Sequence, residues 1–146
     1  MFRRLKENLL LAGFLIVFGF ALYHQVWGRY LYLVTAYCDC PICINVPAYR
    51  DGRFANGREV YWGGAAADPK VKFGSRIELM PQWPRDWKAV RSILKGRRRF
   101  VVEDRGSKIK GRHIDLFIPD RLGGHQAAKR WGARRMRIKL NKEWAR

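Results

Sequence analysis

The stretch from residue 99 to residue 118, RFVVEDRGSKIKGRHIDLFI, constrains the fold of this chain more than any other part of the sequence. Residues 100–103 and 113–118 are rich in β-branched and aromatic side chains, which predicts two strands. The loop between them contains Gly106 and Gly111, and glycine allows both a tight turn and the close approach of a ligand. The stretch therefore predicts two strands that flank a compact loop.

Two aspartates lie beside this loop. Asp104 ends the first run and Asp115 lies just inside the second. If the two strands pair, both carboxyl groups lie at one rim of a sheet, and two acids held together outside bulk water raise the pKa of one of them. A general acid needs such a pKa to be protonated at neutral pH. The alternative is the commoner role of loop aspartates, in which both carboxylates accept hydrogen bonds that brace the turn.

Further elements follow from the alternation and spacing of apolar residues. We expect strands over residues 30–37, 73–80 and 133–140. We expect short helices over residues 87–94 and 125–131. Since strands outnumber helices and glycines are frequent in the connections, the residues alone predict a small, mainly β domain.

Three segments of the chain resemble the three-aspartate (3D) domain family, and the resemblance extends over residues 31–140. The segments are AAADPKVKFGSRIEL (65–79), VVEDRGSKIKGRHIDLF (101–117) and AAKRWGARRMRIKL (127–140). The family pattern contains A-x-D-P and D-x-G-x-x-I-K-G-x-x-I-D, and its three aspartates match Asp68, Asp104 and Asp115. Two departures are Arg105, where Thr is common, and the sequence FANG at 54–57, which replaces T-A-[ST]-G.

This resemblance implies a fold and an activity. The family shares its core with the C-terminal region of membrane-bound lytic transglycosylase A, which implies a small six-stranded double-psi β-barrel with one or two short helices. It implies an enzyme that cleaves peptidoglycan glycan strands, with Asp104 as general acid and base. Asp115 would hold or polarise the proton of Asp104, and Asp68 would line the substrate groove. No cofactor and no metal are implied.

Candidate substrate contacts lie on both sides of these acids. Lys108, Lys110 and Arg105 belong to the central loop, where cations can bind sugar carboxylates or stabilise charge that develops on the sugar. Tyr61 and Trp62 end a loop-rich segment and offer flat faces for sugar rings. The alternatives are that the lysines are solvated and that the aromatic residues cover the barrel core.

The N-terminal segment predicts a membrane anchor. Three cations in MFRRLKEN precede residues 9–23, which carry no charge, and the uncharged run continues to residue 27. This is long enough to cross a bilayer. We expect residues 1–28 to form a cytoplasmic basic end and a single-pass signal anchor over 9–27, and residues 29–146 to form an extracytoplasmic domain. The alternatives are a buried helix and a cleaved signal peptide.

Three cysteines follow the first predicted strand: Cys38, Cys40 and Cys43 in CDCPIC. A zinc site usually needs a fourth ligand, and His113 and His125 are remote in sequence. Outside the cytoplasm a disulfide with one spare thiol is favoured, and a metal site is the alternative.

The formal net charge of the chain is +18. Such a charge favours an anionic partner, which we expect to be peptidoglycan or another anionic wall polysaccharide. The helix predicted over 87–94 has Asp86 as its expected N-cap. Its cations Lys88 and Arg91, with Lys95 and the three arginines at 97–99, form the densest basic patch of the chain. A non-catalytic wall binder of the expansin kind is the alternative function. A membrane-tethered nucleic-acid binder rests on charge alone, and no nucleic-acid partner is expected for an exported domain.

Overall fold

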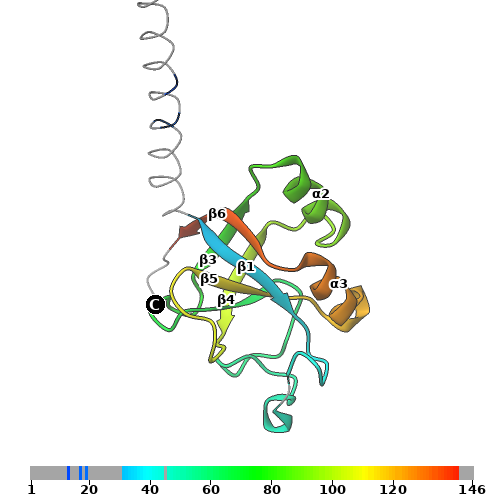
Figure 1. Cartoon of the computed structure of the whole chain (residues 1–146). Coiled ribbons are helices and arrows are strands. Elements are labelled where there is room, and N and C mark those ends of the chain that lie inside the picture. The colour runs from blue at the N-terminus through cyan, green and yellow to red at the C-terminus, as the bar shows by residue number, and fades with distance from the viewer. Residues whose placement is uncertain (1–12, 14–16, 18, 20–30, 45, 142–146) are drawn as a thin grey trace, which may run out of the picture. The chain divides into compact units, whose positions relative to one another are not determined.

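The structure is a computed structural model that describes residues 13, 17, 19, 31–44 and 46–141 (Figure 1). The chain divides into two compact units between residues 31 and 32. Within the described ranges, no helix combines the length and the hydropathy needed to span a membrane. The anchor expected over 9–27 lies almost entirely outside the described residues and stays a prediction.

The second unit contains a closed six-stranded barrel with the strand order β1-β5-β2-β4-β3-β6. Strands β1 and β5 pair in parallel, as do β2 and β4, and the remaining neighbours are antiparallel. The predicted six-stranded, mainly β barrel is therefore confirmed, and the double-psi path of its crossings stays a prediction. The strands are β1 (Tyr32–Tyr37), β2 (Gly64–Ala67), β3 (Arg76–Met80), β4 (Arg99–Asp104), β5 (His113–Phe117) and β6 (Arg134–Asn141).

Two α-helices and two 3-10 turns connect the described strands. They are η1 (Pro47–Tyr49), α2 (Pro84–Ser92), η2 (Asp120–Leu122) and α3 (Gly124–Trp131). Helix α3 ends before Gly132, whose φ of 65° is accessible to glycine at little cost. Its Trp131 packs under β1 and donates a hydrogen bond from Nε1 to the Val34 carbonyl oxygen at 3.1 Å. This contact holds α3 against the first strand.

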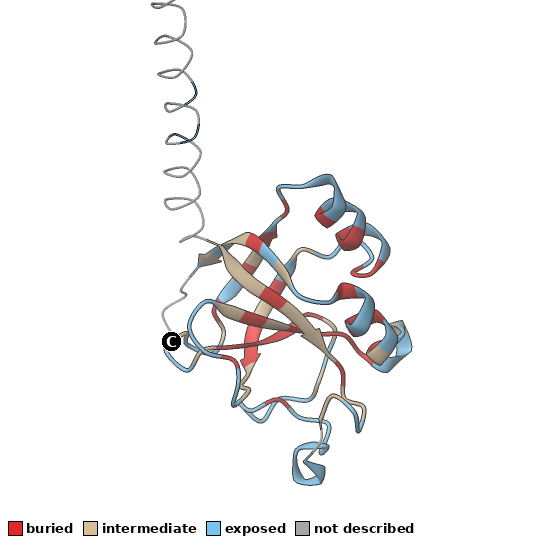
Figure 2. Ribbon diagram, in the orientation of Figure 1, coloured by how far each residue is buried: buried red, intermediate tan, exposed pale blue. Residues whose placement is uncertain are grey.

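The barrel core is formed by alternate residues of the strands, as the period of two in the sequence predicts. Val34, Phe100, Ile114 and Leu116 are at most 1% exposed. Figure 2 shows that buried residues follow the strands and the inner sides of α2 and α3. Burial of each large apolar side chain stabilises the fold by about 1.5–3 kcal/mol. The same alternation sends Thr35, Tyr37 and Asp115 to the opposite side of the barrel wall.

Strand β2 has the sequence GAAA, and all four of its residues are buried. This strand is not predictable from local propensity, since alanine and glycine have low β propensity. Its small side chains let neighbouring segments approach closely. A Cβ atom on Gly64 would collide with the ring of Phe54, which packs directly over this position. The small residues of β2 therefore allow the preceding loop to pack directly against this strand.

The expected capping role of Asp86 is wrong. The N-cap of α2 is Trp83, and no side chain caps the helix. Asp86 lies in the first turn and is only 2% exposed. Its Oδ1 accepts a hydrogen bond from Arg134 Nη1 at 2.9 Å. A buried carboxylate needs a charged partner, so Asp86 joins α2 to the start of β6 instead of ending the helix.

Candidate functional site

Asp104 and Asp115 flank the same residue of β2. Ala66 is the register partner of Asp104 on β4 and of Asp115 on β5. On β1, the Tyr37 hydroxyl donates a hydrogen bond to Asp104 Oδ2, and the Thr35 hydroxyl donates one to Asp115 Oδ1 at 2.6 Å. Thr35 and Tyr37 are two residues apart on one strand and share a face. Both carboxyl groups therefore lie on the same side of the barrel wall. Contrary to the pairing supposed in the sequence analysis, the two strands do not pair directly, because β2 lies between β4 and β5.

The Asp104 carboxylate serves as an acceptor for three donors. Its Oδ1 accepts hydrogen bonds from the Ala55 and Arg105 backbone nitrogens, at 2.9 and 2.8 Å. The third donor is the Tyr37 hydroxyl. Burial and the adjacent Asp104 carboxylate raise the pKa of Tyr37 well above its usual 10.0, so the phenol is protonated at neutral pH. These contacts agree with the bracing role for Asp104.

Asp115 is in a different environment. Burial is the main cause that raises the pKa of Asp115, and the charge of Asp104 adds to it. The hydrogen bond from Thr35 and the proximity of His113 act in the opposite direction. Thr35 Oγ1 also lies 2.9 Å from His113 Nε2, so these three side chains form one network. The carboxyl group of Asp115 therefore binds its proton more tightly than an ordinary aspartate.

Asp68, the third predicted aspartate, connects the end of β2 to the central loop. Its Oδ1 accepts a hydrogen bond from the Lys70 backbone nitrogen at 2.8 Å, and its Oδ2 accepts one from the Gly111 backbone nitrogen at 2.6 Å. These two backbone hydrogen bonds lower the pKa of Asp68. Both of its oxygens are thus committed to the shape of the loop beside the acids.

The three predicted cationic contacts differ in their surroundings. Arg105 Nη2 donates a hydrogen bond to the Val71 carbonyl oxygen at 2.6 Å, and its guanidinium lies 3.8 Å from the Phe73 ring centre. Arg105 therefore joins the central loop to the segment after β2. Lys108 and Lys110 are exposed in the same loop. Their side chains are therefore available to an anionic ligand.

Tyr61 belongs to a second cluster, one that the sequence analysis missed. Glu103 is 1% exposed, and its carboxylate accepts hydrogen bonds from Tyr61 at 2.9 Å, Arg58 at 3.0 Å and Asn56. These contacts fasten the loop before β2 to β4 on the residue next to Asp104. A glutamate within an apolar strand is the one sequence signal that could have indicated this buried charge.

Trp62 lies in a different place from the acids. It lines an open hollow of about 460 Å³, and the Arg97 guanidinium lies 5.2 Å from the Trp62 ring centre. This hollow lies at the start of β4, and the rise per residue of a strand puts it roughly 17 Å from Asp104 at the other end. We call it the basic hollow. Its lining residues are Trp62, Lys95, Gly96, Arg97, Arg98 and Arg99.

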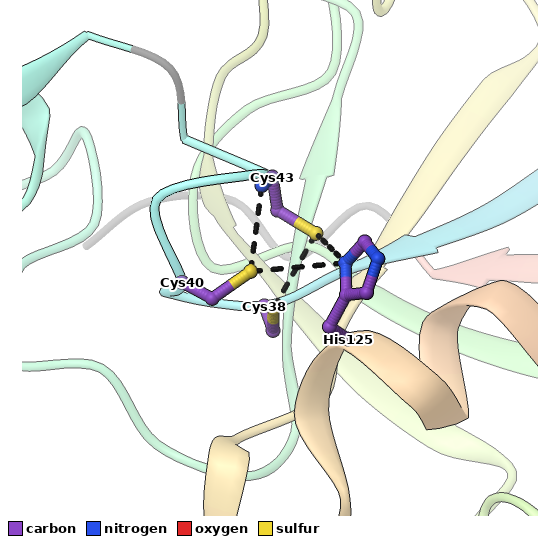
Figure 3. Close-up of side chains that lie close together, drawn as sticks. All are labelled: Cys38, Cys40, Cys43 and His125. Carbon is purple, nitrogen blue, oxygen red and sulfur yellow. Dashed lines mark hydrogen bonds between the residues drawn. The ribbon is translucent and has the colours of Figure 1, made fainter.

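The three cysteines converge with a histidine from α3, as Figure 3 shows. The Sγ atoms of Cys38, Cys40 and Cys43 and a ring nitrogen of His125 all lie within 4.8 Å of one another. All three cysteines are free thiols, so the expected disulfide is not what the structure describes. The fold brings His125, which is remote from the cysteines in sequence, to the three thiols as a fourth candidate ligand.

The fold and the site define a small closed β-barrel with three aspartates around one central loop. The sequence pattern of the 3D domain family matches residues 64–141, more than half of the chain. The chain belongs to the 3D domain family. This match includes Asp68, Asp104 and Asp115 and ends at the last residue of β6.

Solved structures of an Escherichia coli lytic transglycosylase, MltA, are similar to this chain. A variant in an apo form has 17% identity and a TM-score of 0.43, and covers 63% of this chain and 28% of its own. Another crystal structure has 21% identity, a TM-score of 0.41 and coverages of 62% and 28%. A structure with bound chitohexaose has 20% identity, a TM-score of 0.41 and coverages of 63% and 28%. The chain thus spans less than one third of the length of these proteins. A search of curated protein sequences finds no match.

Proposed function

We propose that this chain cleaves the glycan strands of peptidoglycan as a lytic transglycosylase. The observation that carries the proposal is the pair of carboxyl groups, Asp104 and Asp115, on either side of Ala66 and on one side of the barrel wall. Burial raises the pKa of one member of the pair. Membership of the 3D domain family supports the same reaction class.

In this reaction a protonated carboxyl group donates its proton to the glycosidic oxygen. The bond between that oxygen and C1 breaks, and its electron pair stays on the oxygen. The muramyl 6-hydroxyl oxygen then bonds to C1, and its proton passes to the carboxylate. The product ends in a 1,6-anhydro sugar, no water is consumed, and the carboxyl group regains its proton.

The contacts favour Asp115 as the group that carries this proton. The family resemblance assigns the proton to Asp104, but Asp104 accepts three hydrogen bonds that fix the surrounding loop. Burial raises the pKa of Asp115, which is what a general acid requires near neutral pH. In this scheme Asp104 positions Tyr37 and supplies the nearby negative charge, and Asp68 shapes the loop that borders the substrate.

The charge of the chain supports a polymeric anionic substrate. With a formal net charge of +18, the chain attracts polyanions. Lys108 and Lys110 are exposed in the loop that follows Asp104, and the basic hollow lies at the opposite end of β4. We propose that an extended glycan strand with its acidic groups contacts both cationic regions.

The test is incubation of the purified full-length chain with purified peptidoglycan, followed by mass analysis of the soluble fragments. Fragments that end in 1,6-anhydro sugar support the proposal, and reducing ends mean hydrolysis instead. Replacement of Asp115 by Asn should lower the cleavage rate at least about a hundredfold, the usual scale of acid catalysis. Replacement of the exposed Asp51 by Asn is the control and should leave the rate unchanged.

A non-catalytic wall binder is the second candidate. It is favoured by the hydrogen bonds that occupy both oxygens of Asp68 and of Asp104. If the chain binds peptidoglycan but releases no fragment over a full pH range, the binder replaces the enzyme. If the Asp104 to Asn variant alone loses cleavage and the Asp115 to Asn variant keeps it, the proton belongs to Asp104.

We also propose that residues 9–27 anchor the chain as a single-pass segment with residues 29–146 outside the cytoplasm. The support is the uncharged run after the basic N-terminus. A reporter enzyme that works only outside the cytoplasm should be active when fused after Arg146. An inactive reporter of this kind, with an active cytoplasmic one at the same site, reverses the orientation and removes access to the wall.

A further inference from the structure

The cluster of three cysteines and one histidine plays no part in the proposed cleavage of glycan strands. Cys38 follows directly on the last residue of β1, and Cys40 and Cys43 lie in the turn that comes next. His125 is the second residue of α3. Because α3 packs against β1, residues separated by more than 80 positions in sequence point at one small volume (Figure 3).

The separations within the cluster agree with tetrahedral coordination. Zinc binds sulfur at about 2.3 Å and nitrogen at about 2.0–2.1 Å, which puts tetrahedral ligands about 3.8 Å apart for two sulfurs and about 3.5 Å apart for sulfur and nitrogen. His125 Nδ1 lies 3.5 Å from Cys43 Sγ and 3.8 Å from Cys40 Sγ. Cys38 Sγ lies 3.3 Å from Cys43 Sγ. One ion can therefore reach all four atoms with little adjustment.

The turn that carries the thiols is held in place by its own contacts. The Cys43 backbone nitrogen donates a hydrogen bond to Cys40 Sγ at 3.4 Å. The Ile44 nitrogen donates to the Cys40 carbonyl oxygen at 2.9 Å. Arg50 closes the far side with a hydrogen bond from Nε to the Ile44 carbonyl oxygen at 2.7 Å. The thiols are thus oriented by surrounding groups, as ligands of a built metal site are.

Burial in the cluster also fits a closed site. Cys38 is fully buried, and Cys40, Cys43 and His125 are half-buried. Between the first two cysteines, Asp39 Oδ1 is buried with no hydrogen-bond partner among the described residues. A buried carboxylate oxygen of this kind is stabilised by a nearby cation, and a bound dication would supply the charge.

We propose that Cys38, Cys40, Cys43 and His125 bind one Zn²⁺ ion through three thiolates and His125 Nδ1. Four protein ligands complete the tetrahedron and leave no position for substrate, so the site is structural. The ion links the turn after β1 to the first turn of α3. It also fixes the end of β1, where Tyr37 contacts Asp104.

The first measurement is the metal content of the full-length chain purified in detergent without added metal or chelator. We expect about one zinc per chain, the stoichiometry of a single four-ligand site. The His125 to Ala and Cys43 to Ser variants should lower zinc affinity more than about tenfold. The matched control is Gln126 to Ala, since Gln126 is the exposed neighbour of His125 on α3, and it should keep the full zinc content.

The second measurement replaces zinc by Co²⁺ in the same chain. Visible absorption typical of tetrahedral cobalt with thiolate ligands should appear in the wild type and in Gln126 to Ala, and be lost in His125 to Ala. This readout stays informative if a variant binds metal weakly, because the band shape reports the ligand set. Octahedral cobalt spectra in the wild type contradict the proposal.

Alkylation of the folded chain, with and without a chelator, followed by intact-mass analysis without reduction, separates the metal site from the disulfide. Three thiols that react with the alkylating agent only after the chelator is added support the zinc site. A chain two hydrogens lighter, with one reactive thiol and no zinc, overturns it and restores the disulfide. Iron in place of zinc overturns the identity of the ion. These outcomes do not depend on whether the chain cleaves glycan.

Discussion

Thr35 and Asp115 face each other as register partners in the parallel pair of β1 and β5, and the threonine hydroxyl lies 2.6 Å from the aspartate Oδ1. This hydrogen bond favours the ionised carboxylate, whereas burial favours the protonated form. The two effects oppose each other within one strand pair. The pKa of Asp115 is raised because burial outweighs the hydrogen bond.

Replacement of Thr35 by Val should raise the pKa of Asp115 further. Valine has nearly the same shape but donates no hydrogen bond, so the ionised form loses a stabilising contact. The measurement is a carboxyl carbon NMR titration of Asp115 in the variant and the wild type. Ser92 to Ala removes a hydroxyl on α2, where Ser92 bonds only to the helix backbone, and should leave the titration unchanged. A lower pKa in the valine variant contradicts the assigned contact.

Gly64 to Ala should destabilise the fold and disturb the carboxyl pair. The new methyl group would collide with the Phe54 ring, which is 3% exposed and packs edge-on against Phe117. Overpacking of this kind costs about 1–3 kcal/mol in the free energy of unfolding. The measurement is equilibrium denaturation in urea. Because Leu lacks the ring, the double variant with Phe54 to Leu should recover part of the loss, and an unchanged Gly64 variant means the loop does not pack there.

The strands of the barrel were largely predictable, since alternation is a local signal. The run before Asp104 and the run that holds Asp115 formed where β-branched and aromatic side chains are frequent, and the last strand formed where apolar residues alternate with polar ones. Strand β2 was not predicted, because three alanines carry no pattern of their own. Its role as the central strand depends on Phe54 and on both neighbours, which are distant in sequence.

The candidate site was predictable from the sequence only in part. The sequence placed Asp104 and Asp115 beside one loop, but their two strands do not pair, and the unpredicted strand β2 lies between them. His125 could not be assigned to the thiols, because only the packing of α3 on β1 brings them together. Tyr61 and Trp62 are adjacent in sequence, yet the first bonds to buried Glu103 and the second lines the basic hollow. Neighbouring side chains leave a loop in opposite directions, and sequence does not give those directions.

Binding to anionic wall polymers should weaken steeply with salt, and the basic hollow should account for much of that dependence. Replacement of Arg97, Arg98 and Arg99 by Gln removes three cations at one place. Since the attraction is coulombic, the slope of affinity against ionic strength should flatten. Sedimentation of the chain with purified wall polymer at increasing salt measures it.

The control for this experiment removes cations from α3. Lys129 and Arg130 are exposed there, and their replacement by Gln should change the slope less than the hollow variant does. An equal effect of the two variants means that net charge alone attracts the polymer. Salt-independent binding by the wild type means that the hollow serves only solubility.

The raised pKa of Asp115 predicts how the stability of the fold depends on pH. A carboxyl group whose pKa is higher in the folded chain binds its proton more tightly there, so protonation favours folding. Its contribution is fully present below the unfolded pKa, near 3.8, and is lost as pH rises through the folded pKa. The buried Asp115 carboxylate therefore lowers the free energy of unfolding at neutral pH.

Asp115 to Asn should accordingly be more stable than the wild type at neutral pH and should lose that advantage in acid. Asparagine keeps the shape and can still accept the Thr35 hydrogen bond, but it carries no charge to desolvate. Urea denaturation of both chains at a series of pH values gives the difference in free energy of unfolding. Asp68 to Asn is the opposing control, since backbone hydrogen bonds lower the pKa of Asp68 and make its charge stabilising above pH 3.8. A difference between wild type and Asp115 to Asn that stays constant with pH would show that Asp115 has an ordinary pKa, and Asp115 would then lose its assignment as the proton donor.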